Sequence, residues 1–239
     1  MMRILALDAA VNTASVAVLA AGKICAEVTL NTGLTHSEQL MPMVDRALTL
    51  SGIDIAEIEG LAATCGPGSF TGLRIGLATA KGLAQGLQVP IVVKTTLDVL
   101  AAGQVPHMGI ICPILNARRK EVYTCVYKAD GDRIYRQSQP QAVALSELLA
   151  GLSEAPNVLF CGDGVDVYAE AITAQWTGKP LFAQGLNRYV RAGVLAELAE
   201  VDLKVGKGKS YLTVEPYYLR QSEAVLNWEK SHPGECLYD

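Results

Sequence analysis

The stretch that decides the fold of this chain is Gly66-Pro67-Gly68-Ser69-Phe70-Thr71-Gly72-Leu73-Arg74-Ile75-Gly76. It follows an apolar run over residues 61–65, which is typical of a buried strand, and leads into residues 73–87, where apolar side chains recur at helical spacing. A strand, a glycine-rich turn and a helix in this order often present backbone N–H groups to a phosphate. The glycine spacing, however, fits neither the Walker loop nor the dinucleotide-binding fingerprint. The turn is therefore either a phosphate loop of another kind or a tight strand-to-helix corner.

Three small residues in this stretch, Gly72, Gly76 and Ala80, are spaced four apart. Residues at this spacing lie on one face of a helix, and small side chains there allow another backbone to approach closely. Spacing alone favours packing of this ridge inside its own domain. The alternative is a helix–helix interface with another subunit.

Composition limits the classes of function. The chain has 239 residues and a net charge of -4, so tight binding of RNA or DNA by this chain alone is not expected. Its six cysteines form no Cys-x-x-Cys pair, which favours free thiols in a reducing compartment over disulfides or zinc. The N-terminal apolar run is too short for a signal peptide and no run has transmembrane length, so we expect a cytoplasmic protein that does not bind membranes.

Both halves of the chain have the same order of elements, β-β-β-α-β-α. This duplication predicts a two-lobed α/β fold, with a first lobe over residues 1–103 that carries the glycine-rich stretch and a second over 104–239. We expect the extended, Tyr-rich segment 212–220 to pack back on the first lobe. The first half predicts strands at 3–7, 15–20, 25–30, 61–65 and 90–93, with helices near 37–50, 73–87 and 97–102. The second half predicts strands at 109–115, 121–128, 133–137 and 157–161, with helices from 146, at 168–174 and at 189–205.

Asp8 ends the first strand, where two-lobed nucleotide-binding folds place a carboxylate near a metal or phosphate. Ala9, Ala10 and Val11 follow it, and none of them is a glycine that would let a phosphate approach the backbone. The sequence thus favours a surface aspartate that caps the strand–turn corner. A phosphate site, if any, is a vestige formed by Asp8, Gly66 and Gly68.

No catalytic or metal-binding constellation emerges from the remaining polar residues. The three histidines, His36, His107 and His232, lack the i, i+4 spacing of a helical metal site. His36 is expected at a helix start, either in the capping region or at an interface. Ser69 lacks the G-x-S-x-G context of a nucleophile and is predicted to cap the following helix.

The densest cluster of charges is the loop Asn116-Ala117-Arg118-Arg119-Lys120-Glu121. A solvated hairpin loop is the default interpretation, because charge clusters of this length are common on surfaces. A contact with phosphate or RNA is the alternative.

Several of these motifs together resemble the TsaB family of bacterial tRNA threonylcarbamoyladenosine biosynthesis proteins, non-catalytic members of the TsaD-like group. The resemblance covers nearly the whole chain. It departs at Asn116, where an aspartate is expected in that family. The matching motifs are residues 4–8, Thr35-His36-Ser37-Glu38, the glycine-rich stretch 66–76, Glu121-Val122-Tyr123 and Glu215-Pro216-Tyr217-Tyr218-Leu219-Arg220.

The resemblance implies an actin-like/Hsp70-type ATPase (ribonuclease H-like) fold, which agrees with the duplicated order of elements. It also implies a non-catalytic subunit that binds and activates a TsaD-like enzyme in threonylcarbamoyl transfer to the adenosine beside the anticodon of ANN-reading tRNAs. A TsaE-like ATPase completes the complex, the chain also associates with itself, and tRNA is contacted only through the complex. The chain has no cofactor of its own, and any ATP or ADP lies at the partner interface. The interface residues so implied are His36, Leu40, Val44, Gly72, Leu73, Gly76, Ala80 and Leu83.

Two enzymatic alternatives remain at this point. An ATP-dependent phosphotransferase of the same fold would need a glycine-rich loop after Asp8, which the sequence lacks. A metallopeptidase would need metal ligands, and residues 94–100, where a TsaD-like enzyme carries a His-x-x-x-His pair, contain no histidine.

Overall fold

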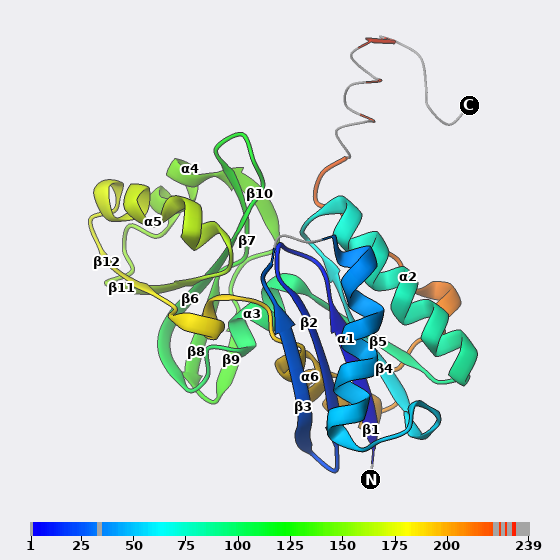
Figure 1. Ribbon diagram of the computed structural model, residues 1–239. Coiled ribbons are helices and arrows are strands. Elements are labelled where there is room, and N and C mark those ends of the chain that lie inside the picture. Colours follow the sequence, from blue (N-terminus) through cyan, green and yellow to red (C-terminus); the bar gives the residue numbers. More distant parts are fainter. Residues whose placement is uncertain (1, 33–34, 222–224, 226–227, 229–230, 233–239) are drawn as a thin grey trace.

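The computed structural model shows two α/β lobes side by side, the first at the right of Figure 1 and the second at the left. It describes residues 2–32, 35–221, 225, 228, 231 and 232. The elements of the first half are β1 (Arg3–Asp8), β2 (Ala14–Ala20), β3 (Lys23–Leu30), α1 (His36–Ser51), η1 (Ile55–Glu57), β4 (Gly60–Gly66), α2 (Phe70–Leu87), β5 (Ile91–Thr95) and α3 (Thr96–Ala102). Those of the second half are β6 (His107–Asn116), β7 (Glu121–Thr124), β8 (Tyr127–Gly131), β9 (Arg133–Arg136), β10 (Gln141–Ala144), α4 (Leu145–Gly151), β11 (Asn157–Cys161), α5 (Gly164–Gln175), β12 (Lys179–Phe182), η2 (Gly185–Arg188), α6 (Ala192–Lys204) and η3 (Tyr211–Thr213).

The two sheets repeat one topology, which confirms the predicted duplication. The first sheet has the order β3-β2-β1-β4-β5, with β1, β2 and β3 antiparallel and β1, β4 and β5 parallel. In the second sheet, β6 occupies the place of β1, and β11 and β12 extend the sheet in parallel. The fold is thus the two-lobed α/β fold expected of actin-like ATPases.

The prediction of the second-half strands was wrong at three places, because β10 and β12 were not predicted and the predicted strand 121–128 is not continuous. The predicted strand 121–128 is divided at Val126, whose N–H is donated to the Ser138 hydroxyl, so β7 pairs with the end of β6 and β8 with its beginning. The start of α1 lacks a side-chain cap. Thr35 is the N-cap residue, but its side chain makes no capping hydrogen bond, and the helix continues through Pro42.

Side chains that alternate along β1 pack on the two faces of the first sheet. Leu5 and Leu7 lie in the core beneath α1 and α2, whereas Ile4 and Ala6 lie in the core beneath α6. Figure 1 shows α1 and α2 side by side on the outer layer of this lobe. The predicted boundary between the lobes therefore needs correction, because α6 belongs to the second half of the sequence but covers the first sheet.

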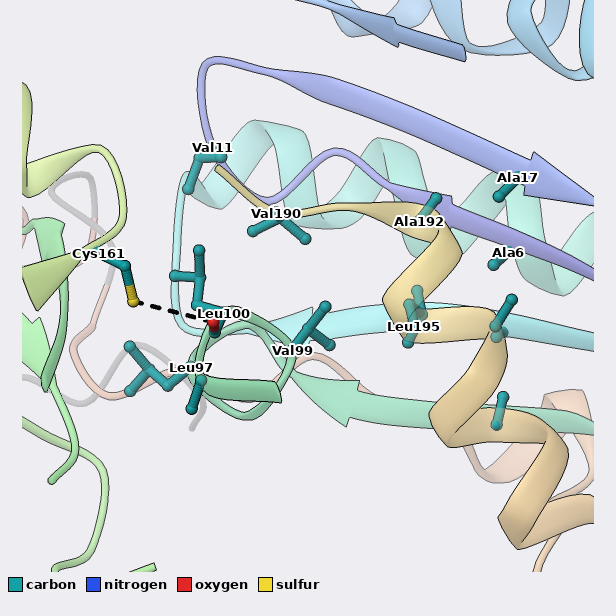
Figure 2. Packing of buried hydrophobic residues seen from close by; sticks show 14 of the residues in the cluster. Ala6, Val11, Ala17, Leu97, Val99, Leu100, Cys161, Val190, Ala192 and Leu195 are labelled. Carbon is teal, nitrogen blue, oxygen red and sulfur yellow. Dashed lines mark hydrogen bonds between the residues drawn. The ribbon is translucent and has the colours of Figure 1, made fainter. Parts of the chain in front are cut away.

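One continuous hydrophobic core also connects the two lobes. It joins Val11 of the β1–β2 turn, Leu97 and Leu100 of α3, Cys161 at the end of β11 and Leu195 of α6 (Figure 2). The Cys161 thiol also donates a hydrogen bond to the carbonyl of Leu100, across 3.8 Å between sulfur and oxygen. The lobes are consequently packed against each other.

Four of the described cysteines are buried free thiols, at positions 65, 112, 125 and 161. Cys25 is an exposed free thiol, and Cys236 lies outside the described residues. Among the described residues, no helix combines the length and apolar character that crossing a membrane requires.

Candidate functional site

The glycine-rich stretch packs directly against the turn between β1 and β2. A Cβ atom added to Gly68 would lie 2.1 Å from the carbonyl oxygen of Ala10, and one added to Gly72 would lie 2.1 Å from that of Ala9. The Ser69 N–H is donated to the Ala10 oxygen at 2.7 Å, and its side chain caps α2 by accepting from the Gly72 N–H, as predicted. Only glycine permits so close an approach of two backbones. The stretch is therefore a strand-to-helix corner that holds the β1–β2 turn.

His36 holds the same turn from the other helix. It is the first residue of α1 and half-buried, and its Nε2 lies 2.7 Å from the Val11 carbonyl oxygen in a hydrogen bond. Both outer helices thus fix the turn through its carbonyl groups.

The small-residue ridge faces the interior of its own lobe, so the interface prediction for these positions needs correction. Gly72, Gly76 and Ala80 are buried, and a Cβ on Gly76 would lie 3.4 Å from the Ala9 side chain. Leu40, Val44 and Leu73 are buried as well. Leu83 is half-buried and packs against the same core. Residues at these positions support the helices from within, and they offer little surface to a second subunit.

A different small-residue stripe of α2 faces outward. Ala78, Gly82 and Gly86 are also spaced four apart and are exposed, and Cβ atoms added to the two glycines would meet nothing within 4 Å. On α1, Met41 and Leu50 are 47% and 55% exposed. These residues belong to the accessible surface of the two helices, together with charged residues such as Asp45, Arg46 and Arg74.

Asp8 is not on the surface, contrary to the prediction. Its side chain is fully buried at the end of β1, where Oδ1 accepts hydrogen bonds from the Thr64 hydroxyl and the Ala10 N–H. Its Oδ2 has no partner among the described residues. Burial, with a smaller contribution from the nearby Asp163 carboxylate, raises the pKa of Asp8 to about 6, although the hydrogen bonds from Thr64 and Ala10 lower it. The side chain caps the strand–turn corner, as expected, but from inside the protein.

The predicted vestigial phosphate site at Asp8, Gly66 and Gly68 is also corrected by the structure. The space next to Gly66 is filled by the Tyr217 carbonyl, 2.4 Å from an added Cβ, and the space next to Gly68 by the Ala10 carbonyl. Carbonyl oxygens repel a phosphate. These glycines accommodate the chain itself.

A cavity of about 580 Å³ opens between the lobes beside this corner. The carboxyl ends of β6 and β11, the β1–β2 turn and the start of α2 contribute to its walls. Its charged lining residues are Arg118, Asp163 and Arg220, and its aromatic lining residues are Phe70, Tyr123, Tyr217 and Tyr218. Burial raises the pKa of Asp163 to about 6, although this carboxylate accepts the Asn116 N–H at 3.1 Å. Volume and lining suit a ligand of nucleotide size.

Residues after η3 pass along this cavity and connect the two lobes. The Tyr217 N–H is donated to the Cys65 carbonyl at 2.7 Å, and the Tyr218 ring stacks on Phe70 with centroids 4.2 Å apart. Arg220 reaches the second lobe, where it forms a 2.8 Å ion pair with Glu121 and donates to the Ala117 carbonyl. Earlier in the segment, the Lys81 ammonium of α2 donates to the carbonyl of Val214.

Comparison with known proteins agrees with this architecture. The family model described as "TsaD: tRNA N6-adenosine threonylcarbamoyltransferase" matches residues 23–228. A relative from Escherichia coli K12, named tRNA threonylcarbamoyladenosine biosynthesis protein TsaB, is 33% identical over 98% of this chain and 100% of its own length. The chain belongs to the TsaB family. The solved structure of YeaZ from Pseudomonas aeruginosa is 25% identical, has a TM-score of 0.76, and covers 92% of this chain and 100% of its own.

The fold of this TsaB-family chain extends to more distant proteins. An activator of 2-hydroxyisocaproyl-CoA dehydratase from Clostridium difficile, with bound ADPNP, is 12% identical and has a TM-score of 0.50, covering 85% of this chain and 97% of its own. This similarity shows the fold alone.

In this TsaB-family chain, sequence reasoning recognised the glycine-rich corner but missed the cavity. The cavity residues come from separate segments, among them residues 10–12, 67–71, 115–118 and 217–221. The only signals in the sequence were the Tyr-rich segment and the charged loop after β6. Within the described residues, no three His, Cys, Asp or Glu side chains lie close enough together to hold a metal ion.

Proposed function

We propose that this chain is a non-catalytic subunit that binds and activates a TsaD-type transferase in the formation of threonylcarbamoyladenosine on tRNA. The observation that carries this proposal is the match to a TsaB protein named for this biosynthesis, over nearly the full length of both chains. The complex includes a TsaE-type ATPase, acts in the cytoplasm, and holds ATP or ADP at the partner interface.

The position of Asp8 supports the non-catalytic role. A phosphotransferase of this fold needs a carboxylate that reaches the ligand, but Asp8 is fully buried and does not line the cavity. The carbonyl groups of Ala9 and Ala10 in the turn face the glycine-rich corner and the start of α2. The turn is therefore filled by contacts within the protein. These features disfavour the phosphotransferase alternative.

The partner binds, in this proposal, on the outer face of α1 and α2. Exposed Met41 and Leu50 provide apolar area there, and Ala78, Gly82 and Gly86 allow a partner helix to approach α2 closely. The same face serves self-association, so a homodimer and the complex with the transferase compete for it.

The test is reconstitution of threonylcarbamoyl transfer to tRNA with purified TsaD-type and TsaE-type proteins, with and without this chain. We expect transfer only when the chain is present. Gly82→Arg should abolish it, because a long charged side chain would obstruct the outer face of α2 without clashing within the monomer. Gly151→Arg is the matched control, since Gly151 is an exposed glycine at the end of α4 in the other lobe, also with no atom within 4 Å.

Two results would contradict the proposal. Transfer at full rate without this chain would exclude the activator role. Full activity of Gly82→Arg, with unchanged self-association in size-exclusion chromatography, would show that α2 is not the interface.

A further inference from the structure

We infer that the cavity between the lobes binds an unpaired nucleotide of RNA, with its base against the aromatic residues and its phosphate near the loop after β6. This inference rests on the proposed function, because it assigns the chain a direct contact with the RNA on which the complex acts. Two of its residues, Phe70 and Arg74, lie in the first turns of α2, ahead of the exposed stripe Ala78, Gly82 and Gly86.

The first observation is a group of planar side chains at the mouth of the cavity. The ring of Phe70 stacks on Tyr218 at an interplanar angle of 17°, and the Arg74 guanidinium lies 4.2 Å from the centroid of the Phe70 ring. Tyr217 and Tyr218 line the cavity and are still 39% and 37% exposed. Aromatic rings and arginine planes of this kind are the surfaces on which unpaired bases stack.

The second observation is a local excess of positive charge in a chain of net charge -4. Two cations, Arg118 and Arg220, and one anion, Asp163, line the cavity, and Arg119 and Lys120 follow Arg118 in the same loop. Arg118, Arg119 and Lys120 have φ angles of 62°, 51° and 64°. Left-handed conformations are unfavourable for residues with a side chain, and three in succession indicate a loop held in a defined shape.

Hydrogen bonds hold this loop to the body of the protein. The Arg118 N–H is donated to Asn116 Oδ1 at 2.9 Å, the Glu121 N–H to the Arg118 carbonyl at 2.9 Å, and the Leu145 N–H to the Lys120 carbonyl at 3.4 Å. The loop therefore has a fixed backbone, and its residue Arg118 lines the cavity. Charged side chains placed in this way attract phosphate groups with little loss of conformational freedom.

The third observation concerns the floor of the cavity. Asp163 and Asn116 both line it, and they bring a carboxylate and an amide to a site that is also lined by aromatic rings. Groups of these kinds form hydrogen bonds with the edges of bases, and the volume of about 580 Å³ is sufficient for one nucleotide. Stacking, phosphate attraction and edge recognition are thus available within one cavity.

The test is binding of a fluorescently labelled RNA hairpin, whose loop bases are unpaired, to the purified full chain, followed by anisotropy. We expect weak, salt-dependent binding and much weaker binding of an uninterrupted duplex of the same sequence composition. Tyr218→Ala should weaken binding about tenfold through loss of stacking, whereas Tyr218→Phe should retain it. Arg118→Ala should weaken binding and reduce the slope of log K against log salt by about 0.7, the value for one phosphate of a single strand.

Tyr135→Ala and Arg133→Ala are the matched controls, because both residues are exposed on β9 and neither lines the cavity. Both variants should bind as the wild type does. The inference is overturned by absence of binding, by equal binding of the duplex, by equal effects of test and control variants, or by displacement of the hairpin with AMP as effective as with unlabelled RNA. That last result would indicate a site for free nucleotides.

This experiment requires no partner protein, so its failure is distinguishable from failure of the proposed function. Loss of hairpin binding together with full activation of the transferase would overturn the RNA site alone. Hairpin binding by a chain that does not activate the transferase would overturn the activator role alone.

Discussion

Two chemically identical substitutions in α2 are expected to change the stability of the protein in opposite directions. In Gly72→Ala, the new Cβ would lie 2.1 Å from the Ala9 carbonyl oxygen, more than an ångström inside ordinary contact. That oxygen belongs to a backbone turn held by α1 and α2, so the turn must move. Overpacking of this kind costs about 1–3 kcal/mol, partly offset by the better helix propensity of alanine.

In Gly82→Ala, the new Cβ would meet no atom within 4 Å on the exposed face of the same helix. Alanine is favoured over glycine within a helix by roughly 0.5–1 kcal/mol, so this variant should be more stable than the wild type. The two variants should differ in free energy of unfolding by about 2 kcal/mol. For a chain of this size this corresponds to roughly 4–8 °C in Tm.

The assay is thermal and urea unfolding of both variants, monitored by circular dichroism, with Gly86→Ala as a second exposed control. Gly72→Ala should unfold at a lower temperature and a lower urea concentration than the wild type. A Gly72→Ala protein as stable as Gly82→Ala would refute the reasoning, because it would show that the glycine-rich corner does not constrain the β1–β2 turn.

Two further predictions concern buried charge. The pKa of Asp8 is raised from 3.8 to about 6 in the folded protein, so ionisation of this carboxyl lowers the free energy of unfolding. This loss of stability is complete above pH 6 and decreases as the pH falls from 6 towards 4. The free energy of unfolding of Asp8→Asn should therefore exceed that of the wild type by a margin that is about 1 kcal/mol larger at pH 7.5 than at pH 5, measured by urea unfolding. A margin that does not change with pH would contradict the raised pKa. Glu27 on β3 forms a 2.6 Å ion pair with Arg191 and accepts the Gly193 N–H at 2.9 Å, which holds the start of α6. Glu27→Ala should lower the free energy of unfolding by about 1–3 kcal/mol, whereas the exposed Glu197→Ala on α6 should change it little; equal effects would show that Glu27 is not the residue that holds α6.

Much of the order of elements could be predicted from the sequence because these signals are local, but the short strands β10 and β12 were not predicted. The apolar runs and the glycine-rich corner each lie within a few residues, and the repetition of one pattern in both halves indicated two similar lobes. The lobe that α6 would cover could not be predicted in this way. Helical periodicity shows which face of α6 is buried, but it contains no information about the sheet on which that face packs.

The two small-residue stripes of α2 illustrate the same limit at the site. Gly72, Gly76 and Ala80 have the same spacing as Ala78, Gly82 and Gly86, yet only the second stripe is exposed. The β1–β2 turn determines which one faces inward, and that turn lies more than fifty residues earlier in the sequence. The cavity was missed for a similar reason, because its aromatic and charged residues come from separate segments between residues 70 and 220.

The position of α6 has a consequence for how the protein is made. During synthesis, the first lobe emerges with one face of its sheet uncovered, since residues 192–204, which cover that face, are translated about 100 residues after the last strand of the sheet. Ile4, Ala6 and Ala17 remain exposed on the nascent chain until α6 leaves the ribosome. A chain that ends before this point leaves this apolar face uncovered, so we expect residues 1–103 expressed alone to aggregate.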